Sequence, residues 1–289
     1  MINKVVFFNF YHNGDIHVSR NFVRKISEIC QQRGISCEYF HPNDPGLLAD
    51  IPYIKHTTNR YGLNDKTQSK ICGNVCFINT WYAGTGNIYK NLGITFECIY
   101  DSFMQNAKLI DIDLSKFDVI DLFPNINYKL YDIAKAQSWI DNHIKTKVFI
   151  CNGDSLSGQA INFSFSEIIN EVSNRRQDID FIISHNDDKV SGSNVFFTRD
   201  IIQKHGFDLN ENTFLASHCP LIIGRMTGVY TFATNRDNYF DNPKTFLAFV
   251  QMPMKSIVWI DKIAPKAKII GYDKTNANDV INIINENLP

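Results

Sequence analysis

The sequence predicts an α/β protein of two Rossmann-like domains that face each other across a cleft. Short apolar segments alternate with helical patterns along the 289 residues. Two of these segments, residues 5–10 and 148–151, run directly into polar loops that contain a glycine. The region from Asn142 to Lys147 separates the two series. We therefore predict an N-terminal domain over residues 1–145 and a C-terminal domain over residues 146–289.

The predicted strands are short and apolar, and several end in turn residues, which is typical of buried strands in a parallel sheet. In chain order they are residues 5–10, 36–40, 75–79, 119–122, 148–151, 181–184, 195–198, 221–224, 256–259 and 268–270.

Helical spacing of apolar residues is clearest over residues 18–32, where Phe22 and Ile26 share one face and Arg33-Gly34 gives a stop signal. Further helices are predicted over residues 96–107, 131–142, 165–175 and 278–287. The last of these is a candidate to return to the N-terminal domain. The segment 42–74 is the least regular and is interpreted as a lid or an acceptor loop.

Composition excludes several classes of protein. The chain has 29 basic and 30 acidic residues, so its charge gives no reason to expect nucleic-acid binding. No leader pattern and no long apolar run is visible, so we expect a cytoplasmic protein with at most peripheral membrane association. The seven scattered cysteines suit reduced, packed thiols better than disulfides or a zinc site.

The loop after the first predicted strand contains an acid and two histidines, Asp15, His12 and His17. In an open α/β sheet this loop lies at the carboxyl edge, where ligands bind. A carboxylate there is a candidate general base, with the histidines as further candidates. Alternatively, Asp15 only caps the following helix, since aspartate is a preferred capping residue.

A second candidate loop is Gly224-Arg225-Met226-Thr227-Gly228, which follows an apolar strand and precedes an apolar run. A guanidinium, a hydroxyl and helix-start amides suit a diphosphate, so we predict that Arg225, Thr227 and Gly228 bind one. The alternative for Arg225 is an interior salt bridge.

Other candidates follow strands of the two predicted domains. Polar residues in the second half are predicted to contact the same diphosphate-containing ligand: Asn152, Ser155, His185 and His218. In the first half, Trp81 and Tyr82 are a candidate stacking platform for an acceptor sugar. Ordinary turn residues and ordinary aromatic packing are the alternatives.

Two Asp-x-Asp pairs, Asp111 with Asp113 and Asp178 with Asp180, raise the possibility of a divalent metal. Both precede predicted strands and therefore fall at the amino edge, away from the expected cleft. We expect no metal site. No Gly-x-x-x-x-Gly-Lys-[Ser/Thr] motif is present, and no Gly-x-Gly-x-x-Gly follows the first strand, which argues against P-loop hydrolases and dehydrogenases.

The early Gly14-Asp15 loop and the late Gly-Arg-x-Thr-Gly segment together resemble two-domain glycosyltransferases of the GT-B type, distantly the heptosyltransferases. The resemblance implies an acidic catalytic residue at Asp15 and a donor-diphosphate loop at Arg225, Thr227 and Gly228. It covers the layout and these two loops. In heptosyltransferases an acidic residue usually precedes the Thr-Gly pair, and here Arg225 stands in that neighbourhood.

The sequence is thus interpreted as a nucleotide-sugar-dependent glycosyltransferase of polysaccharide biosynthesis, of the inverting and metal-independent kind, with Asp15 as general base. Its N-terminal domain would take a glycan or lipid-linked acceptor and its C-terminal domain the nucleotide-sugar donor, which is a substrate and not a cofactor. Two alternatives stay open: a non-catalytic nucleotide- or sugar-binding module, and a metal-dependent transferase that uses an Asp-x-Asp pair.

Overall fold

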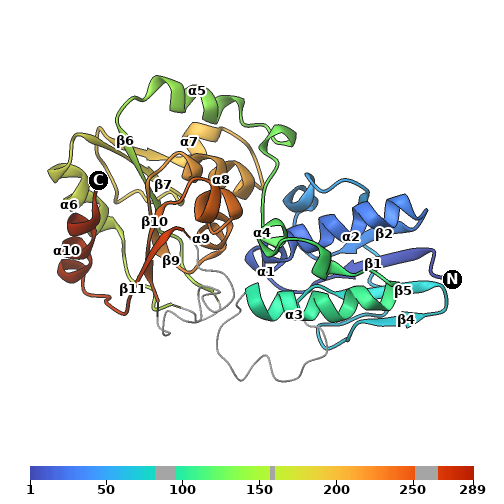
Figure 1. Cartoon of the computed structure of the whole chain (residues 1–289). Coiled ribbons are helices and arrows are strands. Elements are labelled where there is room, and N and C mark those ends of the chain that lie inside the picture. Colours follow the sequence, from blue (N-terminus) through green and yellow to red (C-terminus); the bar gives the residue numbers. More distant parts are fainter. Residues whose placement is uncertain (82–95, 157–159, 251–265) are drawn as a thin grey trace. The chain divides into compact units, whose positions relative to one another are not determined.

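A computed structural model describes residues 1–81, 96–156, 160–250 and 266–289. The chain forms two compact units that divide between Asn125 and Ile126 (Figure 1). Each unit contains a largely parallel sheet with helices packed on it, so the predicted fold class is confirmed. The sequence predicts the boundary at residue 145. In the structure α5 (Ala134–Asn142) packs on the second unit, where Trp139 lies edge-on against Phe196.

The first unit contains a five-stranded sheet in the order β3-β2-β1-β5-β4. The strands are β1 (Lys4–Phe8), β2 (Ser36–Phe40), β3 (Ile54–Thr57), β4 (Lys70–Cys72) and β5 (Val75–Asn79). Only the β4–β5 pair is antiparallel within this sheet. Chain order reverses between β1 and β5, so the loops after these two strands meet at a switch point, where α/β sheets bind ligands.

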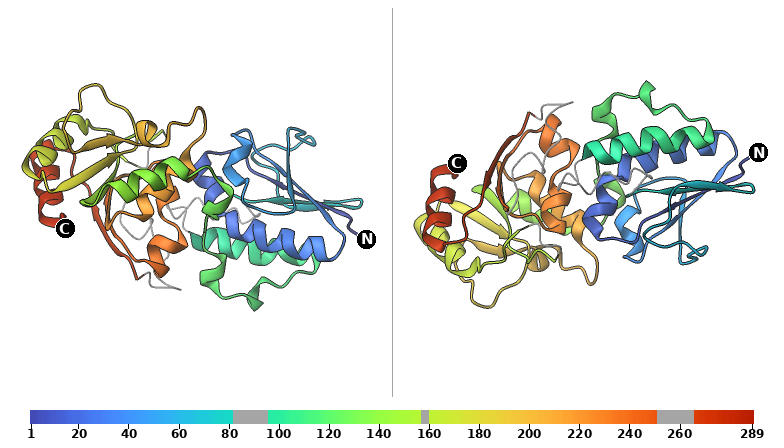
Figure 2. Two further views of the ribbon diagram at one scale, coloured as in Figure 1. Left: turned by 90° about the horizontal axis from the view of Figure 1, so that it is seen from above. Right: turned by 90° about the horizontal axis from the view of Figure 1, so that it is seen from below.

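The helices of the first unit are α1 (Asn13–Val18), α2 (Arg20–Gln32), α3 (Phe96–Asn106) and α4 (Val119–Leu122). Helices α2 and α3 lie side by side (Figure 2), and the rings of Phe22 and Phe103 stack at 4.7 Å between centroids. The helix predicted over residues 18–32 is therefore real, although a separate short helix, α1, precedes it.

The second unit contains a six-stranded parallel sheet in the order β11-β10-β9-β6-β7-β8. The strands are β6 (Thr146–Cys151), β7 (Ile179–Ile183), β8 (Val195–Phe197), β9 (Leu221–Arg225), β10 (Thr245–Phe249) and β11 (Lys268–Tyr272). From β6 the chain adds strands in one direction, and from β9 it adds them in the other. The switch point of this sheet therefore lies between β6 and β9.

The longer helices of the second unit, besides α5, are α6 (Ser166–Arg175), α8 (Leu209–Ser217) and α10 (Ala277–Asn287), and the shorter ones are α7 (Thr198–Ile202) and α9 (Gly228–Ala233). The C-terminal helix α10 packs beside α6 (Figure 1). Its apolar residues Val280, Ile281 and Ile284 join the core beneath β6, β7 and β9. The expected return of this helix to the N-terminal domain was wrong, because its apolar stripe is covered by the second unit.

The strand predictions need correction in the segment 119–122 and at three strands, β3, β4 and β10, that were not predicted. Residues 119–122, predicted as a strand, form α4, because the Asp118 side chain accepts a hydrogen bond from the backbone N–H of Ile120 at 2.9 Å and starts a helical turn. Strand β10 was not predicted, although Phe246–Phe249 are fully or almost fully buried. In a short apolar run, periodicity alone does not distinguish a buried strand from a buried helical segment. The strand predicted over residues 256–259 lies outside the described residues.

Among the described helices, none combines the length and the apolar character that crossing a membrane would require.

Candidate functional site

A pocket of about 950 Å³ opens at the carboxyl edge of the second sheet, at its switch point. Five parts of the chain line it: residues 152–154 and 156 after β6, residues 162–165 before α6, residues 184–189 after β7, Leu209 at the start of α8, and residues 225 and 227–229 at the end of β9. Its volume falls within the usual range of small-molecule sites.

The structure brings most of the predicted donor residues to this pocket. The pocket is lined by Asn152, His185, Arg225, Thr227 and Gly228. These positions come from three different strands, and the parallel sheet gathers their carboxyl ends at one edge.

Two predicted donor residues do not line the pocket. Ser155 is buried, and its backbone N–H donates to Asn162 Oδ1 at 2.8 Å. His218 lies at the opposite edge of the sheet, because it ends α8 just before β9 begins. There its Nδ1 lies 2.9 Å from the carbonyl oxygen of Phe214.

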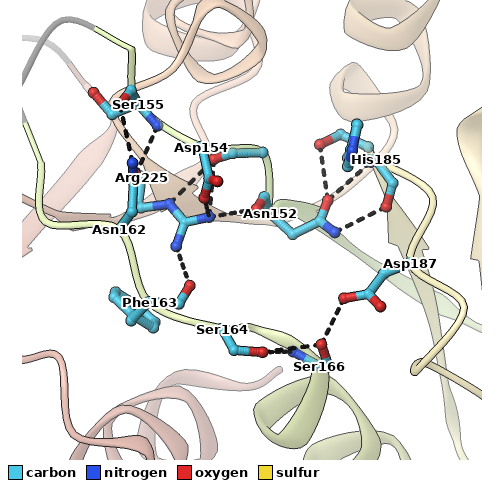
Figure 3. Close-up of polar contacts among 12 residues, drawn as sticks. Asn152, Asp154, Ser155, Asn162, Phe163, Ser164, Ser166, His185, Asp187 and Arg225 are labelled. Atoms are coloured by element: carbon cyan, nitrogen blue, oxygen red, sulfur yellow. Dashed lines mark hydrogen bonds and ion pairs between the residues drawn. The ribbon is translucent and has the colours of Figure 1, made fainter.

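Arg225 is almost completely buried, with 1% of its surface exposed. Its Nη2 donates to the carbonyl oxygens of Asn152 at 2.5 Å and Gly153 at 3.0 Å. Nε also donates to Gly153, at 3.1 Å, and Nη1 donates to the carbonyl oxygen of Phe163. Asp154 accepts a further bond from Nη2 at 3.0 Å. Burial lowers the pKa of Arg225, and the nearby Asp154 carboxylate opposes that effect. The sequence had suggested a guanidinium that faces a phosphate, whereas this one is engaged with the protein's own loops (Figure 3).

Asn152 joins the loops that follow β6 and β7. Its Nδ2 donates to the carbonyl oxygen of His185 at 2.8 Å, and its Oδ1 accepts from the backbone N–H of His185 at 2.8 Å (Figure 3). The His185 side chain itself is exposed. The Asn152 amide thus satisfies both backbone groups of a loop residue, as a strand neighbour would.

The sequence did not single out three residues that shape this pocket: Phe163, Ser166 and Asp187. Ser166 Oγ donates to Asp187 Oδ2 at 2.5 Å, which links the start of α6 to the loop after β7. This hydroxyl bond lowers the pKa of Asp187. A serine in the first turn of the helix predicted over residues 165–175 and an acid two residues after His185 were the available signals.

Thr227 is the N-cap of α9, and its Oγ1 lies 3.4 Å from the backbone nitrogen of Tyr230. Backbone N–H groups at this helix start lie at the edge of the pocket, where Thr227 and Gly228 line it. Lys189 supplies an exposed ammonium to the same pocket.

In the first unit, Asp15 occupies the third position of α1 and completes a capping box with His12. Its Oδ2 accepts from the backbone N–H of His12 at 3.0 Å, and Oδ2 lies 3.6 Å from His12 Nδ1. Burial raises the pKa of Asp15, and the hydrogen bond from the His12 backbone opposes this effect. The His12 side chain is 64% exposed.

His17 is fully buried, and burial lowers its pKa well below the usual range, with Arg20 and Arg24 adding to the effect. A residue so placed does not meet an incoming substrate in this structure. Trp81 is 8% exposed, and its ring packs against Tyr11 at 5.5 Å between centroids. Tyr82 lies outside the described residues.

One carboxylate of each Asp-x-Asp pair serves local structure. Asp113 caps a turn by accepting from Ser115, with N and Oγ at 3.1 and 2.6 Å from Oδ1. Asp178 forms an ion pair with Arg176 at 2.8 Å. Within the described part of the chain, no group of three or more histidine, cysteine, aspartate or glutamate residues is arranged to hold a metal ion.

No protein-family model and no curated protein matches this sequence. Solved structures match over nearly the whole chain. A glycosyl transferase of family 9 from Veillonella parvula superposes with a TM-score of 0.54, 12% identity and coverage of 99% of this chain and 91% of that one. The E. coli heptosyltransferase WaaC with ADP-2-deoxy-2-fluoro heptose gives 0.51, 10% identity, and coverage of 99% and 100%.

The chain has the GT-B fold. Another structure with which it shares this fold is S. aureus MnaA in complex with UDP, at a TM-score of 0.50, 13% identity, and coverage of 99% of this chain and 87% of that one. At these identities the GT-B assignment concerns the architecture, and the chemistry has to be argued from the chain's own residues.

Proposed function

We propose that the protein is a glycosyltransferase whose nucleotide-sugar donor binds in the pocket of the second unit. The observation that carries this proposal is the position of the pocket. It lies at the switch point of a parallel sheet, at the carboxyl ends of β6, β7 and β9, and polar side chains and helix-start amides line it. The ADP-sugar and UDP complexes among the structures of the same fold support this reading.

In this proposal, different parts of the donor bind in two parts of the pocket. The diphosphate lies against the amides that open α9 at Thr227 and Gly228, with Lys189 supplying a positive charge. His185 and Asn152 border the remaining space. Because the nucleotide sugar is consumed, it is a substrate, and the proposal requires no cofactor or metal.

The acceptor side rests on the first unit, where Asp15 is the proposed general base. One oxygen of this carboxylate, Oδ2, caps α1 by accepting from the backbone N–H of His12. The carboxylate would take the proton of an acceptor hydroxyl as that oxygen attacks the anomeric carbon. The bond from this carbon to the diphosphate breaks, the nucleoside diphosphate leaves, and the configuration inverts. A glycan or lipid-linked acceptor belongs to this proposal.

The direct test is incubation with a panel of ADP-, UDP- and GDP-sugars, with and without glycan acceptors. We expect at least one donor to be transferred or slowly hydrolysed, with undiminished turnover in excess chelator. Loss of turnover in chelator would replace the metal-independent mechanism by a metal-dependent one. Absence of binding by every donor would contradict the proposed function.

A second candidate is a non-catalytic nucleotide- or sugar-binding module. The capping box favours it, because that box explains the presence of Asp15 without any catalytic role. Binding of a donor without transfer or hydrolysis over the whole panel would support this candidate.

A further inference from the structure

We propose that Arg225 is a positioning residue, the centre of a closed ring of hydrogen bonds that shapes the pocket before a ligand enters. The loops in this ring are residues 152–154, 163–166 and 184–187, together with the end of β9. The ring is a property of the ligand-free protein. Only its consequence for nucleotide affinity rests on the proposed function.

The first half of the ring runs through Arg225 itself. Its guanidinium reaches backwards in sequence to Gly153, at 3.0 and 3.1 Å, and to the carbonyl oxygen of Phe163. A single side chain on β9 therefore holds two loops at once, one after β6 and one before α6. Carbonyl oxygens in such loops otherwise need water or another donor.

The second half of the ring runs around the far side of the pocket. Asn152, whose carbonyl oxygen accepts from Arg225, holds the backbone of His185 with its side-chain amide. Two residues later, Asp187 accepts from Ser166 Oγ at 2.5 Å. Ser166 follows Phe163 by three residues, so the circuit closes (Figure 3).

The geometry of Arg225 is unsuited to direct phosphate binding. Nε, Nη1 and Nη2 all donate to protein oxygens. The guanidinium carbon also lies 5.1 and 5.0 Å from the ring centroids of Phe163 and Phe165, which provide cation–π contacts. A bidentate phosphate contact would require two parallel N–H donors, and those donors already bind the loops.

The ring predicts a specific pattern of affinities. A residue that binds the phosphate groups directly contributes to the affinity for a nucleoside diphosphate but not to the affinity for the bare nucleoside. A positioning residue contributes to both by the same factor, because it fixes the pocket that holds them. The two roles are therefore distinguished by comparing adenosine with ADP, and uridine with UDP.

The first experiment needs no ligand. Hydrogen exchange is measured on the ligand-free Arg225→Met variant, with Arg175→Met as the matched control, since Arg175 is an exposed arginine of α6 paired with Glu171. We expect the amides of residues 152–155 and 184–189 to exchange at least about tenfold faster in Arg225→Met only. Unchanged exchange in these loops would overturn the ring.

The second experiment measures affinity for the four ligands by NMR titration or calorimetry. Arg225→Met should weaken the nucleoside and its diphosphate by the same factor, about tenfold, and Arg175→Met should change neither. A loss confined to the diphosphates would make Arg225 a direct phosphate ligand and overturn the proposal. If the wild type binds none of the four, the titration is repeated with guanosine and GDP. Absence of binding there as well contradicts the proposed function, while the exchange experiment still decides the ring.

A milder variant covers the case in which Arg225→Met does not fold. Ser166→Ala breaks the ring on the opposite side, and Ser166 does not line the pocket. We expect faster exchange around Asp187 and the same equal, smaller loss of affinity for nucleoside and diphosphate. Wild-type exchange and affinity in Ser166→Ala would show that the loops are held independently, which contradicts a ring.

Discussion

Buried polar side chains are the most informative residues of this chain. Arg20 and Arg225 are the largest fully buried side chains, and the structure stabilises their charges in different ways. Arg20 pairs with the equally buried Asp50, whereas Arg225 binds mainly backbone carbonyl oxygens. Removing one partner of a buried ion pair strongly destabilises the folded protein. A charge that is held by carbonyl oxygens depends on the geometry of the loops that supply them.

His41 gives a pH-dependent prediction at this scale. It is 3% exposed, and burial lowers its pKa to about 4, with the neighbouring His56 ring at 4.6 Å adding to the effect. Because the unfolded state binds a proton near pH 6.5 and the folded state does not, the stabilisation is present above pH 6.5 and is lost as the pH falls toward 4. We expect the wild type to lose about 2 kcal/mol of unfolding free energy between pH 7.5 and pH 5 through this residue.

The measurement is urea unfolding at both pH values, with His41→Gln as the comparison. The variant should lose about 2 kcal/mol less than the wild type on acidification. Buried His17 contributes to both proteins equally, so only the difference between them reports on His41. Identical pH dependence in the two proteins would contradict the prediction.

Tyr230 gives a second residue-scale prediction. It is 1% exposed, and its hydroxyl has no hydrogen-bond partner among the described residues. Removing an unsatisfied buried hydroxyl is nearly neutral or stabilising. We therefore expect Tyr230→Phe to have an unfolding free energy equal to or higher than that of the wild type. A loss above about 1 kcal/mol in urea unfolding would indicate a partner for the hydroxyl.

At the scale of elements, the close approach of β6 and β9 supports the pocket. Gly224 pairs with Cys151 across these strands, and a Cβ at Gly224 would lie 2.5 Å from Cys151 Cβ and 2.6 Å from its carbonyl oxygen. The next residue along β9 is Arg225, so the strand spacing also places the guanidinium over the loop after β6.

We expect Gly224→Ala to lower the unfolding free energy by about 1–3 kcal/mol, the usual cost of overpacking a buried site. The matched control is Gly153→Ala, because a Cβ at Gly153 would meet nothing within 4 Å. Thermal or urea unfolding of the two variants provides the measurement. Equal stability of both variants would show that the strands separate at little cost.

At the scale of the whole molecule, the two proposed roles belong to different compact units. Asp15 lies in the unit that ends at Asn125, and the pocket lies entirely in the unit that follows. Each unit has its own sheet and its own switch point. Donor binding and activation of the acceptor should therefore respond independently to mutation.

Asp15→Asn tests this independence. Asparagine keeps the shape and an oxygen that accepts from the His12 backbone, but it removes the proton acceptor. If Asp15 is the base, turnover should fall by about 10²- to 10⁴-fold, with donor affinity and melting temperature almost unchanged. Because burial raises the pKa of Asp15, wild-type turnover should also decline on acidification at a higher pH than for an ordinary carboxyl group.

Near-wild-type turnover of Asp15→Asn, under conditions in which chemistry limits the rate, would contradict the role of Asp15. His12 would then be the next base to test, because its side chain is 64% exposed. A weakened donor affinity in this variant would instead indicate that the two units are coupled.

The sequence alone determined the α/β class, most of the strands and the loops that gather at the pocket. These features are local, since an apolar run, a glycine and a polar loop are read within about ten residues. Only the tertiary structure decided where side chains point. The partners of Arg225 lie 62 to 73 residues away in sequence, so no local pattern shows that its guanidinium holds loops. For the same reason the sequence does not show which unit α10 packs on, since its apolar stripe is covered by residues distant in sequence. It also does not show at which edge of the sheet His218 lies, because that depends on where β9 begins.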